Sequence, residues 1–453
     1  MTVSMRFENV KRKFQSIFND PSIKELFKHS SYLFYGNIFF VGSEFLQAVL
    51  YGRYLGVEQF GLLAIILTYV YMVRRILDIR VWEAATKYLS EFKVKGDRER
   101  VYATVKLVYL TDLSMGIAAF IMAIIGAPLL AKYVIHSIEP VELIKLFSIY
   151  ILFMAVDNTS KAILRVFDKF KWLMLQEIFR SCTILSLVTI ILLKGYGIKE
   201  VITVFLIGAG LGSAVLIGMA LKTIVFYTRN MRRSSKISLL SDRIKEMFKF
   251  MIYTHLGSLG GAIVRFAPTM LLGYFRNPTE VGYYKLAERF VQVPALVIDP
   301  FYYAIYPKLS RMWSAGNIEV FKDYIKKVTS SMILIMLPIA LIIFAFTPFV
   351  INLFIGKEFL PAVAAVRIMI WGIVIAGVLV WARPAILSIN RPEVSLIASL
   401  IGAVVLLCWT IITIPFWGYI GSAFGFNISY VLGHIILIAG IKKTVFAVSK
   451  ARL

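Results

Sequence analysis

The chain has 453 residues, of which 59% are hydrophobic and only 17% charged, and its formal net charge is +24. A soluble domain carries about a quarter charged residues, so this composition excludes a water-soluble globular protein. The apolar residues instead predict an all-α polytopic membrane protein. Residues 1–31 are basic and amphipathic, and we expect no cleavable signal peptide there, because no apolar stretch ends in small residues.

A helix needs about 20 apolar residues to cross the hydrocarbon core of a bilayer. This window predicts about twelve spans, at residues 32–54, 60–79, 103–130, 142–163, 173–193, 201–226, 250–274, 282–306, 328–352, 361–388, 394–415 and 420–441. Charged residues interrupt the second, fourth and eighth of them. Apolar and aromatic residues flank each interruption, so we expect these three segments to span as well.

Lysine and arginine concentrate in alternate connections between the predicted spans. The sparse side carries few of them, namely Lys132, Lys145, Lys194, Lys199, Arg276 and Lys357. Because basic connections stay in the cytoplasm, this bias predicts that both termini are cytoplasmic. It also explains the net charge by contact with anionic membrane lipids, so we expect no nucleic-acid partner.

The longest polar segment between spans lies near the middle of the chain and predicts two six-helix lobes. We expect a basic N-terminal segment, a first lobe, a linker, a second lobe and a tail, at residues 1–31, 32–226, 227–249, 250–441 and 442–453. A faint internal repeat agrees with this division. Gly61 and Gly282 follow similar residues, Gly195 and Gly418 each precede a tyrosine, and both pairs are separated by about half the chain. Transporters are often built from such repeats.

Ionisable side chains inside spans are costly unless they line a wet cavity or find partners. Arginines outnumber acids there, which predicts an electropositive interior and an anionic cargo such as phosphate, which arginine binds well. The candidate substrate-binding residues are Arg74, Arg75, Arg265, Arg289 and Arg383, and the candidate ion-coupling residues are Glu44, Asp157 and Asp299. The alternative is local pairing, as in Arg74–Asp78 and Lys285–Glu288, or snorkelling to head groups.

Motifs for other chemistry are absent from the sequence. There is no phosphate-binding glycine loop, no HExxH and no Cys/His cluster, so we expect no metal, no cofactor and no ATP hydrolysis, although proton or sodium coupling is open. The two cysteines, Cys182 and Cys408, both lie in apolar runs. We expect them to be buried as small hydrophobic residues.

Several short motifs, in their order along the chain, resemble the polysaccharide transporters of the O-antigen flippase type. They are Leu55–Gly61, Asn277–Ala287, Tyr306–Ser310, Leu353–Phe359 and Gly418–Ala423. These transporters belong to the MOP superfamily, with the MATE drug exporters and the lipid II flippases. The chain departs from many members at Asp78–Glu83, where charged residues replace an Asp-Leu-Gly-Leu-like stretch.

The resemblance implies two six-helix lobes, alternating access, and a flippase in the cell membrane. Its cargo would be an oligosaccharide on a polyprenyl phosphate or pyrophosphate, moved from the cytoplasmic to the outer leaflet for surface polysaccharide or glycan synthesis. Membrane lipids and glycan-assembly enzymes are the expected partners. Two alternatives remain, a MATE-like ion-coupled exporter and a membrane-embedded glycosyltransferase or polymerase. The first needs a cavity rich in carboxylates, and the second needs catalytic carboxylates near large outer loops.

Overall fold

The computed structural model describes residues 21–229 and 237–450, with side chains from residue 31 to 445 except at 257, 297, 299, 300, 303 and 304. These residues form helices and contain no strand, which confirms the all-α prediction. The helices of the first part are α2 (Pro21–Leu77), α3 (Val81–Val94), α4 (Arg98–Leu130), α5 (Val141–Phe153), α6 (Asp157–Val166), α7 (Phe170–Leu193) and α8 (Ile198–Tyr227). Those of the second part are α9 (Ile244–Phe275), α10 (Pro278–Ser314), α11 (Ile318–Val350), α12 (Ala362–Val378), α13 (Ala382–Ser388) and α14 (Pro392–Lys450).

Two of these helices fold back on themselves at a glycine. In α2, Gly56 has φ 78° and ψ 169°, and the rings of Tyr51 and Phe60 stack 6.4 Å apart, whereas a straight helix would separate them by about 13 Å. In α14, Gly418 has φ 54° and Trp409 Nε1 donates to the carbonyl of Gly421 at 3.0 Å. Each helix is therefore a hairpin whose two arms correspond to two predicted spans.

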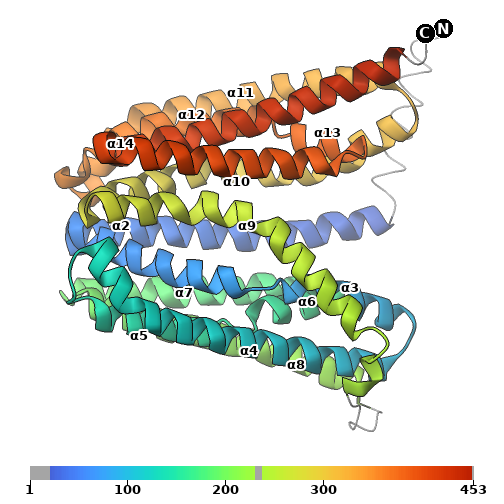
Figure 1. Cartoon of the computed structure of the whole chain (residues 1–453), viewed down its shortest axis with the longest axis horizontal. Coiled ribbons are helices and arrows are strands. Elements are labelled where there is room, and N and C mark those ends of the chain that lie inside the picture. Colours follow the sequence, from blue (N-terminus) through green and yellow to red (C-terminus); the bar gives the residue numbers. More distant parts are fainter. Residues whose placement is uncertain (1–20, 230–236, 451–453) are drawn as a thin grey trace.

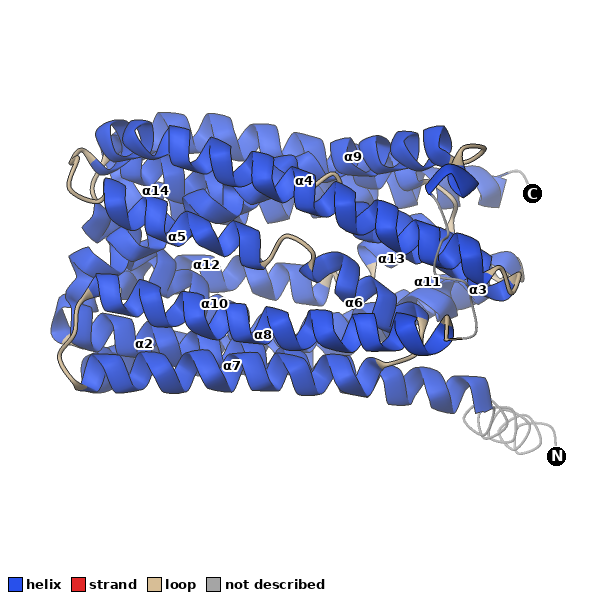
Figure 2. Ribbon diagram, turned by 90° about the horizontal axis from the view of Figure 1, so that it is seen from below, coloured by secondary structure: helices blue, strands red, loops and turns tan. Residues whose placement is uncertain are grey.

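Seven helices of the described residues are long and apolar enough to cross a membrane, or eight if the bent pair Ile244–Leu256 and Ser258–Phe275 of α9 is counted. The hairpins α2 and α14 are among the seven. The helices lie side by side along one axis, and most loops gather at the two ends (Figure 2). The chain is thus a multi-pass membrane protein, and the number of crossings stays a prediction. The eighth predicted span is not among the seven, because α10 carries several charged residues.

Two predicted spans are broken within their length, although the second of them is still long and apolar enough to count as one span, Ala362–Ser388. The span at 142–163 breaks between α5 and α6 at residues 154–156, and the span at 361–388 breaks between α12 and α13 at residues 379–381. Figure 2 shows the first break at mid-length of the molecule. Lipid offers no hydrogen-bond donor to the carbonyls that the break sets free, so side chains donate to them. Ser213 Oγ donates to Phe153 O at 2.6 Å, and Arg74 Nη2 donates to Met154 O at 2.7 Å.

Two further features differ from the sequence predictions. Helix α3 was not predicted, because its apolar face is only one side of a short amphipathic helix; that face buries Tyr88, Leu89 and Phe92. Cys182 and Cys408 are exposed, not buried. In a membrane protein the outer surface contacts lipid, so an apolar residue gains little from an interior position.

The backbone repeats itself between the first and second parts of the chain. Left-handed conformations occur at matching points of the helix order, in the pairs Gly96 and Gly316, His136 and Gly356, Asp168 and Asn390, and Gly195 and Gly418. The two helix breaks also match, as do the π-helical turns Ala131–Ile135 and Ile351–Ile355 that follow α4 and α11. These matches support the predicted internal repeat, whereas the exact lobe boundaries stay a prediction.

The two parts of the repeat meet through equivalent glycines. A Cβ on Gly61 would lie 1.7 Å from the carbonyl oxygen of Pro278, and a Cβ on Gly282 would lie 2.6 Å from the carbonyl oxygen of Val57. The contact is reciprocal, as in a two-fold interface. Each glycine therefore lets the backbones of α2 and α10 touch directly. Aromatic rings surround the contact, with Phe359 packing against both Phe60 and Tyr283.

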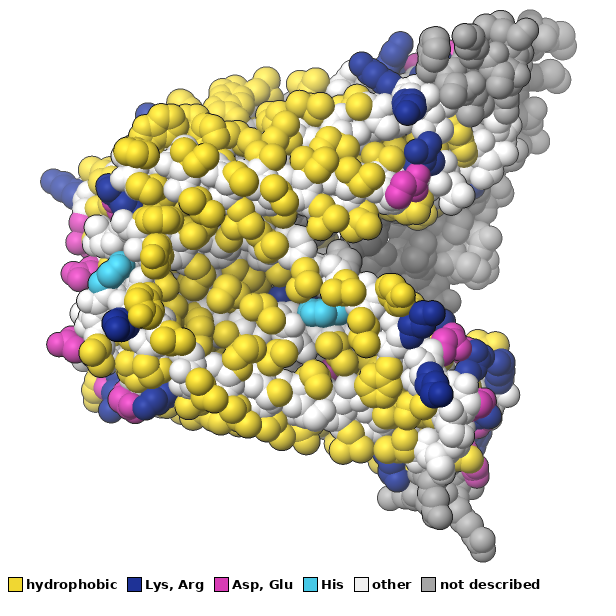
Figure 3. Space-filling model, in the orientation of Figure 1, with side chains coloured by type: hydrophobic (Ala, Val, Ile, Leu, Met, Phe, Trp, Pro, Cys, Tyr) yellow, Lys and Arg dark blue, Asp and Glu magenta, His cyan; other side chains and the backbone are white. Residues whose placement is uncertain are grey.

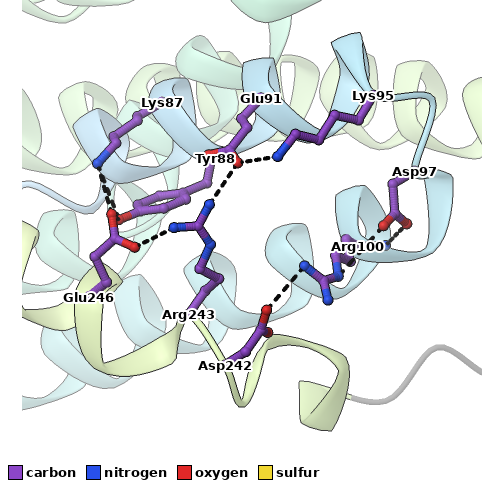
Figure 4. A network of polar contacts seen from close by, with 9 residues as sticks. All are labelled: Lys87, Tyr88, Glu91, Lys95, Asp97, Arg100, Asp242, Arg243 and Glu246. Carbon is purple, nitrogen blue, oxygen red and sulfur yellow. Dashed lines mark hydrogen bonds and ion pairs between the residues drawn. The ribbon is translucent and has the colours of Figure 1, made fainter.

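A polar network joins α3 and α4 to the start of α9 (Figure 4). Glu246 accepts from Tyr88 Oη at 3.0 Å and from Lys87 Nζ at 3.2 Å. Arg243 bridges Glu246 at 2.6 Å and Glu91 at 2.9 Å. The network, which we call the α3–α9 network, holds the end of the predicted linker against the first part of the chain. Hydrogen bonds from Tyr88, Lys87 and Arg243 lower the pKa of Glu246 from its ordinary value of 4.5.

We expect Gly61→Ala to destabilise the protein, because the new methyl group would overlap the Pro278 carbonyl and overpacking costs about 1–3 kcal/mol. Thermal unfolding of the purified protein in detergent measures this as a lower Tm. The matched control is Gly42→Ala in the same helix, where nothing lies within 4 Å of the added atom and Tm should not fall. An unchanged Tm for Gly61→Ala would contradict the close contact.

The α3–α9 network should depend on pH. Because the folded state lowers the pKa of Glu246, the network is complete above pH 4.5 and is lost as the pH falls through the lowered pKa. Amide hydrogen exchange at the start of α9 should therefore accelerate in acid, and Glu246→Gln should show the faster exchange already at neutral pH. Glu319→Gln, an exposed acid of α11 paired only with Lys322, is the control. Equal protection in wild type and Glu246→Gln would rule the network out as the cause.

Candidate functional site

The candidate site is the hollow between the two parts of the molecule. Figure 1 shows α10–α14 on one side and α4–α8 on the other, with α2 and α9 between them. In the space-filling view the surface is hollowed between these sides, and a basic side chain is visible inside a largely apolar wall (Figure 3). The described chain begins and ends at the same end of the molecule, the end that also holds α3 (Figure 1).

Two of the predicted arginines, one on α2 and one on α9, lie within electrostatic reach of each other. Arg265 is exposed and makes no ion pair within the part of the chain that the structure describes. It lies close enough to Arg75 for their charges to repel each other. Arg75 is 26% exposed and is only loosely paired with Asp78, at 3.5 Å. Asp78, the predicted partner of Arg74, is thus paired with Arg75. The charges of Arg75 and Arg265 together give a positive field between α2 and α9.

Arg74 occupies a different place from Arg75. Its guanidinium donates to the carbonyl of Met154 in the α5–α6 break and lines a small interior cavity with Asp78, Asp112 and Asn158. Neighbouring residues on a helix point about 100° apart, which explains why two adjacent arginines have different surroundings. The position of Arg74 is therefore that of a side chain supporting the break.

Arg289 and Glu44 form an ion pair between α10 and α2, and each side chain is more than a quarter exposed. Arg289 also donates to Gln292 Oε1 at 3.1 Å. We predicted cargo binding for Arg289 and ion coupling for Glu44, and the structure brings the two residues together across the contact between the repeats. Nearby on α10, Lys285 and Glu288 pair at 2.6 Å, as their spacing predicts.

The remaining two predicted site residues lie apart from these groups. Arg383 is exposed on α13 and has no acid partner among the described residues. Asp299 falls within α10, but its side chain is outside the described residues. Their assigned roles stay predictions.

Asp157 belongs to a buried charge network that sequence reasoning missed. It is 4% exposed, lies 3.7 Å from Arg180 Nη1 and accepts a hydrogen bond from Ser213 Oγ. Arg180 also pairs with Glu177, which in turn pairs with Lys161 at 2.9 Å. Two acids and two bases leave the network neutral. The i,i+3 spacing of Glu177 and Arg180 inside an apolar run was the available signal.

A metal centre has no support in the described residues, which hold no group of three or more His, Cys, Asp or Glu side chains suited to a metal ion. Another missed residue is Asp112 of α4. Its side chain is 8% exposed and its Oδ2 atom has no hydrogen-bond partner in the described part of the chain. Only its position in a long apolar run could have identified it.

Comparison with known sequences identifies the family. The model of a family described as polysaccharide biosynthesis protein matches residues 26–313, and that of the MatE family matches residues 256–412. Over 417 residues the chain is 22% identical to the probable low-salt glycan biosynthesis flippase Agl15 of Haloferax volcanii, covering 91% of this chain and 82% of that protein. It is 26% identical over 199 residues to an uncharacterized membrane protein, MJ1068, of Methanocaldococcus jannaschii, a match spanning 43% of this chain and 38% of that protein.

Solved structures identify the fold. A multidrug resistance MATE family transporter of the MOP superfamily in an inward-facing conformation superposes with a TM-score of 0.72 at 17% identity, covering 90% of this chain and 94% of that one. The lipid II flippase MurJ in an inward closed conformation gives 0.70 at 19% identity, covering 93% and 90%. An outward-facing MATE family transporter gives 0.62 at 16% identity, covering 94% and 96%.

These matches confirm the resemblance found in the sequence, and they place the chain among transporters and not enzymes. The family match covers more than half of the chain, and the fold match extends over nearly all of it. The chain belongs to the polysaccharide biosynthesis protein family and has the fold of the MOP superfamily transporters.

Proposed function

We propose that the chain is a flippase for a lipid-linked oligosaccharide. The cargo is an oligosaccharide on a polyprenyl phosphate or pyrophosphate, and it moves from the cytoplasmic to the outer leaflet for surface polysaccharide or glycan synthesis. Its family and its similarity to the probable glycan flippase Agl15 support this proposal. The phosphate and sugars would pass through the hollow between the two parts of the molecule, while the lipid tail remains in the bilayer.

The observation that carries the proposal is the exposed positive charge of Arg265 on α9, within electrostatic reach of Arg75. An exposed arginine at membrane depth is costly unless it faces water or an anionic partner, and the described residues give Arg265 no acid partner. Arg75 lies opposite and adds to the field. A phosphate accepts two parallel hydrogen bonds from a guanidinium, so this field favours the anionic head group of a lipid-linked sugar.

The acids near the hollow argue for an anionic cargo over a cationic drug. A binder of cations needs carboxylates that are free to face the cargo. Glu44 is instead paired with Arg289, and Asp78 accepts from Arg75, from Asn158 and from the backbone of Arg80. Positive charge thus remains exposed at Arg265, whereas Glu44 and Asp78 are both paired.

Alternating access would move the cargo. The glycine contact between α2 and α10 joins the two parts, and rocking about such a contact would close one end of the hollow while opening the other. The TM-score is higher with the inward-facing MATE structure, 0.72, than with the outward-facing one, 0.62. The distribution of lysine and arginine predicts that the chain ends and the linker lie in the cytoplasm.

Ion coupling through Glu44 or Asp157 would require their ion pairs to open. Glu44 pairs with Arg289 across the contact between the two parts, so relative movement of the parts would change its environment. Asp157 is held within one part by Arg180 and Ser213. Of the two residues, Glu44 is therefore the better candidate for a group that responds to the transport cycle.

The proposed function is tested with the purified chain in liposomes that contain a fluorescent polyprenyl-pyrophosphate oligosaccharide. We expect label to become accessible in the opposite leaflet only in vesicles that contain the protein, as followed by quenching from outside. Empty vesicles and heat-treated protein are the controls. Uptake of cationic dyes without any movement of the labelled lipid would instead identify a drug exporter.

Arg265→Gln should slow this flipping about tenfold or more, because hydrogen bonds between charged groups each contribute about 1.5–3 kcal/mol. Arg265→Lys should retain part of the rate, since it keeps the charge and loses the bidentate geometry. The matched control is Arg53→Gln, which removes another exposed arginine, near the end of the first arm of α2. Both variants should elute as wild type on size exclusion. A wild-type rate in folded Arg265→Gln would remove Arg265 from the cargo site.

A further inference from the structure

A small cavity lies inside the first part of the molecule, beside the α5–α6 break. Its volume is about 20 Å³, and the residues that line it come from α2, α4, α5, the break and α6. A cavity of this size holds one water molecule. It is therefore too small for any part of a sugar or lipid. The polar residues of its wall are Arg74, Asp78, Asp112 and Asn158.

Asp112 is the least satisfied of these polar residues. Its side chain is 8% exposed, and its Oδ2 atom has no hydrogen-bond partner among the described residues. The hydroxyl of Thr159 on α6 faces this carboxyl and is itself fully buried. It can donate to the carboxylate and can accept from the protonated carboxyl, so it can serve both charge states of Asp112.

Positive charge lies on only one side of Asp112. The charged groups that face it are Arg74 at the end of α2 and Asp78 just after it. Helix α5 contributes Ile151, the break contributes Ala155, and α6 contributes Asn158 and Thr159. On α4 itself, Tyr109 donates to or accepts from Ser160 Oγ at 2.8 Å. No ion pair joins Asp112 to Arg74 in the described residues, because Arg74 donates to Met154 O.

A buried carboxylate without a partner is expensive, so Asp112 needs either a bound cation or a proton. Arg74 lines the same cavity, and its charge opposes any cation there, a proton included. The space is about that of one water molecule, so a metal ion would have to shed its waters to enter. A proton needs no such space, and the neutral carboxyl can donate to Thr159 or to a water in the cavity.

We propose that Asp112 is a proton-binding site whose charge state controls Arg74 and the α5–α6 break. When the carboxyl O–H gives its proton to the cavity water, that water releases a proton to solvent past Asp78, whose side chain is 18% exposed. The new carboxylate then attracts the Arg74 guanidinium away from the Met154 carbonyl. Reprotonation restores the observed arrangement. The break thus has two states, and the proton selects between them.

The role of this site in transport rests on the proposed flippase function, whereas proton binding by Asp112 does not. Two measurements keep them separate. The first is the infrared spectrum of purified protein titrated with acid and base, in which a buried protonated carboxyl gives a C=O band distinct from that of carboxylates. We expect such a band at neutral pH, its loss in Asp112→Asn, and its retention in the burial-matched control Asp157→Asn, because Asp157 is paired with Arg180.

If Asp112→Asn fails to fold, Thr159→Val replaces it as the test variant. It should shift the same C=O band without abolishing it. Absence of the band in wild type, or its persistence in folded Asp112→Asn, would overturn the proposal. A change of the spectrum with sodium in place of potassium, at constant pH, would overturn it as well, because it would identify a metal ion as the ligand.

The second measurement is the flipping assay with an imposed pH gradient. For one coupled proton, a gradient of one pH unit should change the steady-state leaflet ratio about tenfold, in wild type and in the exposed-acid control Glu142→Gln. Asp112→Asn should still equilibrate the label between the leaflets, and its leaflet ratio should not depend on the pH gradient. A wild-type response in Asp112→Asn would overturn coupling through this site. Absence of flipping in every protein, with the Asp112 band present, would refute the flippase function and leave the proton site standing.

Discussion

The two parts of the molecule touch backbone to backbone where Gly61 meets the Pro278 carbonyl and Gly282 meets the Val57 carbonyl. Only glycine permits this approach, because any Cβ would overlap the opposing oxygen. The contact is the same from both sides, so neither half can shift along the other without breaking it. The glycine contact therefore fixes how α2 and α10 lie against each other, and the Glu44–Arg289 ion pair and the α3–α9 network join the two parts at further points.

The membrane imposes a second constraint, which explains how charge is distributed inside the protein. Polar groups in a bilayer must find partners within the protein. Most acids at membrane depth have done so, in the pair Glu44–Arg289 and in the network of Asp157 with Arg180. Arg74 likewise satisfies a carbonyl that the α5–α6 break sets free. Among the described residues, Arg265 has no acid partner and the Oδ2 atom of Asp112 has no hydrogen-bond partner. The two proposals rest on these two side chains.

These two residues would serve different steps of one cycle. Arg265 is exposed on α9, where an anionic head group can reach it, whereas Asp112 is buried beside a space of about one water molecule. The second arm of α2 connects them, since Arg75 lies within electrostatic reach of Arg265 and Arg74 lines the Asp112 cavity. A change at the proton site could therefore move the wall of the hollow through adjacent residues of one helix.

Much of this protein is determined by its sequence alone. The apolar runs predict the membrane helices, since only about 20 such residues can cover the hydrocarbon core, and the family motifs predict the superfamily fold. The matching glycines Gly61 and Gly282 reveal the repeat. What the sequence could not determine is which charges meet. Glu44 and Arg289 lie on helices far apart in the chain, Arg74 and Arg75 are neighbours with different surroundings, and the break at residues 154–156 has no glycine or proline to announce it. These features depend on which helix faces pack together, and packing is decided by the whole tertiary structure.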